Sequence, residues 1–169
     1  MTGPVFVDAD VFLYARDERD PRKHERARGW LDHLWREGRG RTSLQVLSEV
    51  YVNLKRRELT TLTPAAAWES VAKYLAWKPR AIDEELFNAA WEIEQRYRIA
   101  WWDSMVVAAA KLQKCEVLLT EDLHDGAAFG TLVVRSPFTL AAEQPAAPYA
   151  TRFAALHRPR GRPRRTALA

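Results

Sequence analysis

The chain has 169 residues, of which 47% are apolar and 28% charged. This balance is typical of a globular protein with one domain and a substantial core. The single cysteine, Cys115, excludes an internal disulfide and a cysteine-based zinc cluster. No apolar stretch reaches the length of a membrane span, and residues 1–4 do not resemble a signal peptide. We therefore expect a cytoplasmic protein without membrane contact.

The net charge of +4 is unevenly distributed along the chain. Residues 1–140 hold 20 Lys and Arg against 21 Asp and Glu, whereas residues 141–169 hold six Arg against one Glu. The basic character therefore belongs to the C-terminal segment, and the rest of the chain is nearly neutral.

Short apolar runs alternate with segments of helical periodicity. Continuous runs of the kind found in strands buried on both faces occupy residues 4–8, 117–120 and 132–135. Residues 42–44 and 80–82 are weaker strand candidates. Apolar residues at helical spacing predict five helices, at residues 27–37, 44–58, 64–78, 84–97 and 102–114.

This alternation predicts an α/β fold with a central parallel sheet of about four to five short strands flanked by helices. We assign residues 1–138 to this domain. Residues 139–169, rich in Ala, Pro and Arg, form a basic extension that we expect to be largely disordered. The seven tryptophans are scattered, and we expect most of them to pack in the core.

Four acidic residues fall where such a fold builds a ligand site. Asp8 and Asp122 follow two predicted strands, and the carboxyl ends of parallel strands meet at one edge of the sheet. Glu49 lies on a polar stripe beside the apolar face of its helix. Asp103 falls in the first turn of its helix, where the dipole favours a carboxylate. Together they predict an oxygen-rich site for Mg²⁺ or Mn²⁺.

Taken singly, each acid has a simpler explanation. Asp8 could initiate a turn, Asp103 and Asp122 could cap helices, and Glu49 could be a solvated helix residue. The four positions as a group favour a site, because each falls where this fold class places its ligands.

Four ordered motifs resemble those of the PIN-domain family, and most of all the VapC-type toxins of prokaryotic toxin–antitoxin pairs. The motifs are VDADVFLYA at 7–15, LSEVY at 47–51, WDSMVVAAA at 102–110 and LLTEDL at 118–123. The segment VVRSPF at 133–138 resembles the last strand of the family. The match covers residues 4–138, and four motifs in order are far more specific than any one of them.

The resemblance implies a PIN-like fold and a Mg²⁺-dependent ribonuclease in which Mn²⁺ can replace Mg²⁺. The metal-holding catalytic residues would be Asp8, Glu49, Asp103 and Asp122, and cleavage would leave a 5′-phosphate and a 3′-hydroxyl. It also implies the toxin of a type II pair, which acts on RNA as a homodimer. A small cognate antitoxin would cover the acidic pocket with one of its segments.

Two alternatives remain open from the sequence. One is a PIN-domain nuclease that processes RNA and has no antitoxin. The other is a catalytically inactive PIN-like module that only binds nucleic acid, although the presence of all four acids argues against it. A short upstream reading frame for a small DNA-binding protein would favour the toxin.

Asp10 departs from the family pattern, because related proteins carry a small neutral polar residue such as Asn or Ser there. We interpret Asp10 as the cap of the helix that follows it, with a fifth carboxylate in the site as the alternative. Thr120, Ser104 and Asn53 are candidates for hydrogen bonds that orient the acids.

The basic tail has a weak motif of its own. Arg160-Gly161-Arg162, flanked by prolines, resembles the core of an AT-hook, in which arginines lie in a narrow minor groove of DNA. A generic Arg-rich tail, with nonspecific affinity for nucleic acid through counterion release, is the favoured interpretation.

Overall fold

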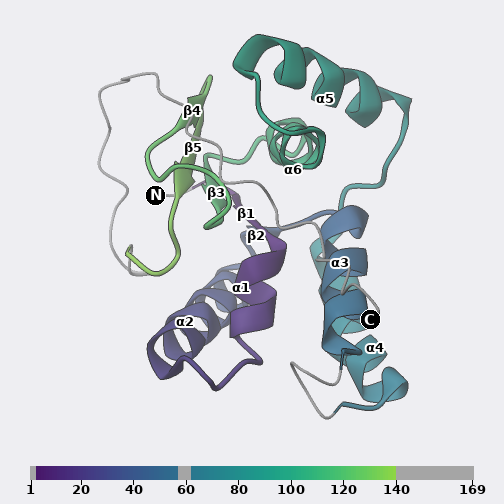
Figure 1. Ribbon diagram of the computed structural model, residues 1–169, viewed down its shortest axis with the longest axis vertical. Helices are drawn as coiled ribbons and strands as arrows, with labels where there is room; N and C mark the ends of the chain where they lie inside the picture. The colour runs from purple at the N-terminus through teal and green to yellow at the C-terminus, as the bar shows by residue number, and fades with distance from the viewer. Residues whose placement is uncertain (1–2, 57–61, 140–169) are drawn as a thin grey trace, which may run out of the picture.

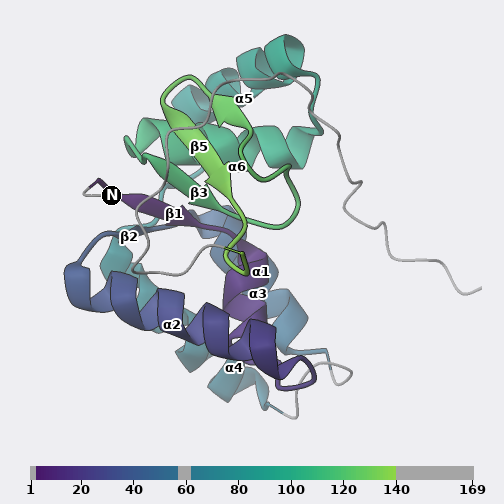
Figure 2. The ribbon, with the colours of Figure 1, turned by 90° about the vertical axis from the view of Figure 1, so that its left-hand side faces the viewer.

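The apolar run after Pro4 forms a central strand of a five-stranded sheet, whose strands lie one beside another in Figure 2. The computed structural model describes residues 3–56 and 62–139 of the chain. The strand order is β2-β1-β3-β5-β4, and only the β4–β5 pair is antiparallel. The strands are β1 (Val5–Val7), β2 (Gly40–Arg41), β3 (Val117–Leu119), β4 (Ala128–Phe129) and β5 (Leu132–Arg135).

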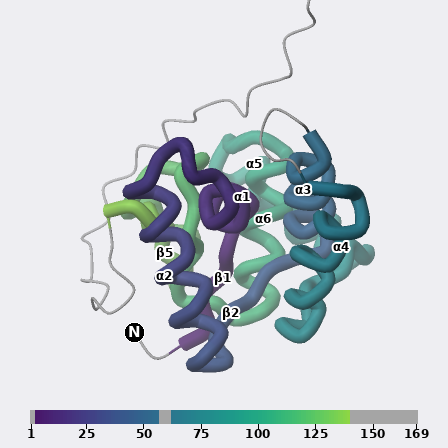
Figure 3. Tube along the Cα trace, turned by 90° about the horizontal axis from the view of Figure 1, so that it is seen from below, coloured from purple at the N-terminus to yellow at the C-terminus, as the bar shows by residue number. Residues whose placement is uncertain are grey.

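Helices cover the sheet on both sides, which confirms the predicted α/β architecture (Figures 1 and 2). On one side lie α5 (Glu84–Tyr97) and α6 (Trp101–Leu112), and on the other lie α1 (Ala9–Tyr14) and α2 (Pro21–Glu37). Figure 3 shows α1 between α2 and α3 (Leu44–Leu54), with α4 (Pro64–Ala72) packed beside α3. A 3₁₀ helix, η1 (Lys73–Trp77), continues α4.

The continuous apolar runs follow from this two-sided cover. Every side chain of β1 and β3 is buried, as expected for parallel strands with helices on both faces. The indole of Trp30 on α2 donates a hydrogen bond to the carbonyl of Pro137 at 3.0 Å. This contact ties the end of the described chain to the same core.

Side-chain caps begin four of the helices, and those at Thr63 and Asp83 agree with the predicted helix starts. The side chains of Asp20, Ser43, Thr63 and Asp83 each accept a hydrogen bond from a backbone N–H of the first turn that follows. Gly38 ends α2 in the left-handed conformation, with φ at 65°. Local capping chemistry therefore fixes where these helices begin and where α2 ends.

Several boundaries differ from the prediction. The strand expected at residues 42–44 is wrong: β2 lies two residues earlier, since Ser43 has to leave the sheet to cap α3. Residues 80–82 contribute only an isolated bridge between Arg80 and Ser43. The helix expected to reach residue 58 ends at Leu54. The two-residue strand β4, too short to leave a periodic signal, was not predicted.

The expectation that most tryptophans pack in the core is wrong. Only Trp30 and Trp77 are buried, and Trp101 is half-buried. The other four expose between 46% and 58% of their surface: Trp35, Trp68, Trp91 and Trp102. Exposed side chains of this size mark surfaces that contact other molecules.

Two further expectations concern a membrane span and the C-terminal extension. Within residues 3–56 and 62–139, no helix has both the length and the apolar character needed to cross a bilayer. The basic extension from residue 140 onward, including the Arg160–Arg162 motif, lies outside the described residues.

The burial of β3 predicts a large cost for truncating its central side chain. Leu118 is completely buried, so Leu118→Ala should lower the free energy of unfolding by about 2–5 kcal/mol. Leu75 on η1 is 47% exposed, so Leu75→Ala should change it by less than about 0.5 kcal/mol. Urea unfolding of both variants measures the difference, and equal effects would contradict this account of the core.

Candidate active site at the carboxyl ends of β1 and β3

Asp8 links the two central strands at the edge where they end. Val7 pairs in register with Leu119, and the Asp8 N–H donates to the Leu119 carbonyl at 3.1 Å. The Asp8 side chain is buried and caps α1, accepting from the Ala9 N–H at 2.8 Å. Its second oxygen accepts from the Thr120 hydroxyl at 2.9 Å. Parallel pairing thus places Asp8 beside the loop that follows β3.

Thr120 connects Asp8 to Asp122. Its hydroxyl oxygen accepts from the Asp122 N–H at 3.0 Å while its proton is donated to Asp8. Thr120 is completely buried. The predicted orienting role of Thr120 is therefore confirmed, whereas Ser104 and Asn53 donate only to backbone carbonyls of their own helices.

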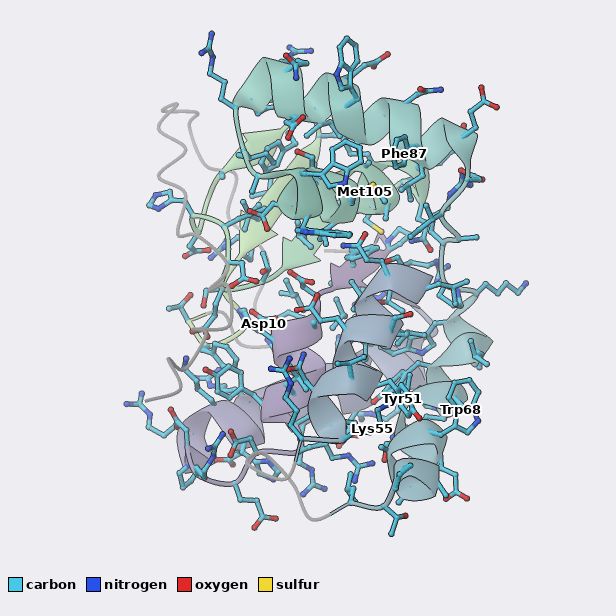
Figure 4. All side chains as sticks on the ribbon, turned by 45° about the vertical axis from the view of Figure 1, so that its right-hand side comes forward. Asp10, Tyr51, Lys55, Trp68, Phe87 and Met105 are labelled. Carbon is cyan, nitrogen blue, oxygen red and sulfur yellow. The ribbon has the colours of Figure 1, made fainter. Side chains whose placement is uncertain are left out.

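Asp10 is not the helix cap that we expected, because Asp8 has that role. Asp10 lies within the first turn of α1, where its carboxylate accepts from the N–H groups of Val11 and Glu121. The second bond crosses from α1 to the loop after β3. Figure 4 shows Asp10 near the start of α1, close to the ends of the strands.

The electrostatics of Asp10 show that three carboxylates are crowded together. Burial, together with the negative charges of Asp8 and Asp122, holds the pKa of the Asp10 carboxyl well above its usual range. The hydrogen bonds from Glu121 and Val11 oppose this shift without cancelling it. Asp8, Asp10 and Asp122 therefore form one interacting acidic group.

Asp103 lies on α6. It is the third residue of that helix and is buried. Ala100 precedes the helix without a side-chain cap, so the first-turn N–H groups leave a positive end beside the Asp103 carboxylate. The sequence expectation for this residue, a carboxylate in the first turn of a helix, is confirmed.

Glu49 lies on α3 and is half-buried. It lines a hollow of about 670 Å³ whose apolar wall includes Trp102, the residue immediately before Asp103. The remaining lining residues are Leu44, Gln45, Ser48, Ala81 and Ile82. Glu49 and the start of α6 thus open onto one shared hollow.

The acids do not form a closed metal cage. Among residues 3–56 and 62–139, no three Asp, Glu, His or Cys side chains are gathered closely enough to ligate one ion directly. The donor chemistry nevertheless fits a hard cation, since carboxylate oxygens are the ligands of Mg²⁺ and Mn²⁺. Mg²⁺ also retains several of its waters and does not require three protein ligands.

Sequence analysis overlooked an ion pair beside these acids. Lys23 on α2 donates to both carboxylate oxygens of Glu121, at 2.8 and 2.7 Å. The sequence did show that Glu121 immediately precedes Asp122, and this position could have pointed to Glu121. Nothing in the periodicity of α2 distinguished Lys23 from its other charged residues.

Comparisons with known proteins agree with this fold. The family model of the PIN domain matches residues 5–124. The chain is similar to the structure of Mycobacterium tuberculosis VapC20, a sarcin-ricin loop cleaving toxin, with 23% identity over 68% of this chain and 86% of that one, at a TM-score of 0.50. A toxin–antitoxin complex from Klebsiella pneumoniae gives 17% identity over 79% and 97%, at a TM-score of 0.52. Among curated proteins, none matches.

The hydrogen-bonded role of Thr120 predicts an order of stabilities. Thr120→Val keeps the volume but removes the hydroxyl that donates to Asp8 and accepts from the Asp122 N–H, which should cost about 1–3 kcal/mol. Thr120→Ser keeps the hydroxyl and loses one methyl group, and should cost less. Chemical unfolding without added metal compares the two. A serine variant less stable than the valine variant would show that packing, and not the hydrogen bonds, makes Thr120 important.

Proposed function

This chain belongs to the PIN-domain family, and from the acidic group at the ends of its central strands we propose that it is a metal-dependent endoribonuclease. The observation that carries the proposal is the buried acidic group of Asp8, Asp10 and Asp122, in which burial and the two neighbouring negative charges raise the pKa of Asp10. Like charges held together at a buried edge are stabilised by a bound cation. A nuclease needs such a site, because a divalent ion activates water and neutralises charge on the phosphodiester.

Each acid has a distinct part in the proposed site. Asp8, Glu49, Asp103 and Asp122 would hold Mg²⁺, or Mn²⁺ in its place. Thr120 keeps the Asp8 carboxylate in one orientation through its 2.9 Å hydrogen bond. The start of α6 adds the positive end of a helix dipole near Asp103. Asp10 would add negative charge to the site without holding the ion itself.

We further propose that the protein is the toxin of a type II toxin–antitoxin pair and acts on RNA. The support is the likeness in fold to VapC20 and to the Klebsiella complex, together with the four motifs. The partner would be a small antitoxin that covers the acidic site with one segment. An RNA-processing nuclease with the same site and no antitoxin is the second candidate, because the acids alone do not distinguish the two.

A homodimer is the proposed assembly, and the exposed apolar surface around α5 supports it. Phe87 and Trp91 are one helical turn apart on α5 and expose 54% and 58% of their surfaces. The Phe87 ring packs edge-on against Trp101 at 4.9 Å between centroids, so this surface continues to the start of α6. A second copy would bury these side chains.

Replacing Asp103 with Asn tests the nuclease proposal. The substitution keeps the shape and removes a charged ligand, so cleavage should fall by more than about 100-fold, since even groups that merely orient metal ligands contribute 10–100-fold. Brief induction in a bacterial host, followed by mapping of RNA ends, should give new 5′-phosphate ends and growth arrest with the wild type only.

Equal expression and equal unfolding midpoints of the two proteins serve as the control. RNA ends that are identical for wild type and Asp103→Asn would contradict a toxin nuclease active in that host. In that case the alternative of a noncleaving binding module would be favoured, and nucleic-acid affinity would be the next quantity to measure.

A charged residue in the centre of the proposed dimer surface should dissociate it. Trp91→Glu should give a monomer by light scattering at concentrations where the wild type has twice the monomer mass. Trp68 on α4 is exposed to a similar extent, 55%, so Trp68→Glu is the matched control and should stay dimeric. The proposal fails if the wild type is monomeric, or if both variants dissociate alike.

A further inference from the structure

The loop that carries Asp122 is fixed at three points. The Thr120 hydroxyl donates to Asp8, the Glu121 N–H donates to Asp10, and the Glu121 carboxylate accepts from Lys23 on α2. The first two contacts bind the loop to residues of the acidic group itself. The third binds it to a helix that contributes no carboxylate to that group.

Lys23 is held in a site of its own. Besides Glu121, its ammonium group donates to the Tyr14 hydroxyl at 3.2 Å. It also lies 4.5 Å from the centroid of the Tyr14 ring and 4.8 Å from that of Phe138. These two rings pack edge to face at 5.0 Å. The cation is thereby placed by aromatic faces and hydrogen bonds together.

The pair with Glu121 differs from an ordinary surface ion pair. Lys23 and Glu121 expose only 28% and 31% of their side chains, and both oxygens of the carboxylate are within 2.8 Å of the ammonium nitrogen. By contrast, Arg19 in its pair with Asp17 is 64% exposed. Partial burial and fixed geometry are the conditions under which an ion pair orders a segment of chain.

The Lys23–Glu121 ion pair also gives the adjacent acids Glu121 and Asp122 different roles. Because both oxygens of Glu121 accept from Lys23, this carboxylate is directed to α2. The next residue, Asp122, instead lies close enough to Asp10 for its negative charge to act on that carboxyl. Lys23 therefore holds the Glu121 side chain away from the acidic group.

Resting on the nuclease proposal, we propose that Lys23, acting through Glu121, is a positioning residue that sets the geometry of the Asp122 loop and thereby the affinity of the site for a divalent cation. Lys23 touches neither the cation nor the RNA in this role. It acts by keeping Asp122 in place and Glu121 out of the ligand set.

The direction of the effect distinguishes positioning from simple electrostatics. Removing a positive charge near a cation site should by itself strengthen cation binding, since one repulsive interaction is lost. If Lys23 positions the loop, Lys23→Met should instead weaken binding, by roughly 10-fold, as groups that orient metal ligands do. The two explanations therefore predict opposite signs.

The experiment measures Mn²⁺ binding to the RNA-free full-length protein by titration calorimetry, with cleavage rates measured in parallel. Lys23→Met should weaken Mn²⁺ binding about 10-fold and raise the Mn²⁺ concentration needed for half-maximal cleavage, while the rate at saturating Mn²⁺ recovers. Lys23→Arg should bind like the wild type, because a guanidinium can bridge both oxygens of Glu121. Arg19→Met, which breaks the exposed pair with Asp17, should also bind like the wild type.

The outcomes separate this inference from the nuclease proposal. Lys23→Met that binds Mn²⁺ as tightly as the wild type, or more tightly, overturns the positioning role while the nuclease proposal stands. Weakened binding that Lys23→Arg does not restore overturns it as well. A wild type that neither binds Mn²⁺ nor cleaves RNA removes both proposals. A wild type that binds Mn²⁺ without cleaving RNA removes only the nuclease, and the comparison of variants still decides the role of Lys23.

Discussion

Repulsion between carboxylates is the constraint on which the rest of this structure depends. Burial, together with the negative charges of Asp8 and Asp122, raises the pKa of Asp10, yet the fold holds the three carboxylates at one edge of the sheet. Two devices oppose the repulsion. Parallel pairing of β1 and β3 fixes the spacing of Asp8 and the following loop. Hydrogen bonds from backbone N–H groups and the Thr120 hydroxyl solvate the charges.

In the proposed nuclease, this arrangement would place negative charge where a phosphate of the substrate has to bind. Several carboxylates held together repel a polyanion unless a cation lies between them and it. Cation binding and substrate binding are therefore expected to be linked. The Lys23–Glu121 ion pair lies outside the acidic group and also helps to keep this arrangement in place. It anchors the loop that carries Asp122 to α2.

The sequence predicted the parts of the fold that local chemistry determines. Buried strands β1, β3 and β5 left continuous apolar runs, and Thr63 and Asp83 were recognisable as helix caps, whereas Ser43 had been assigned to a strand. Strand β2 was displaced by two residues and β4 was missed, because two-residue strands are defined by their neighbours rather than by their own residues.

The candidate site was predictable in outline but not in its contacts. Strand ends and the first turn of a helix pointed to Asp8, Asp122 and Asp103. The role of Asp10 was misinterpreted. An acidic residue at the start of a helix gives the same sequence pattern whether it caps that helix or accepts a hydrogen bond from a distant loop. Lys23 was invisible, since its partner Glu121 lies 98 positions away in the sequence. Pairings at that separation depend on tertiary packing.

The central claim is that the acids at the carboxyl ends of β1 and β3 hold a divalent cation. Anomalous X-ray diffraction from crystals grown with Mn²⁺ tests it most directly. The account predicts an anomalous peak within coordination distance, about 2–2.5 Å, of carboxylate oxygens of Asp8 and at least one of Glu49, Asp103 and Asp122. Mn²⁺ bound only elsewhere on the protein, with the acidic edge free of anomalous density at saturating concentration, would contradict it.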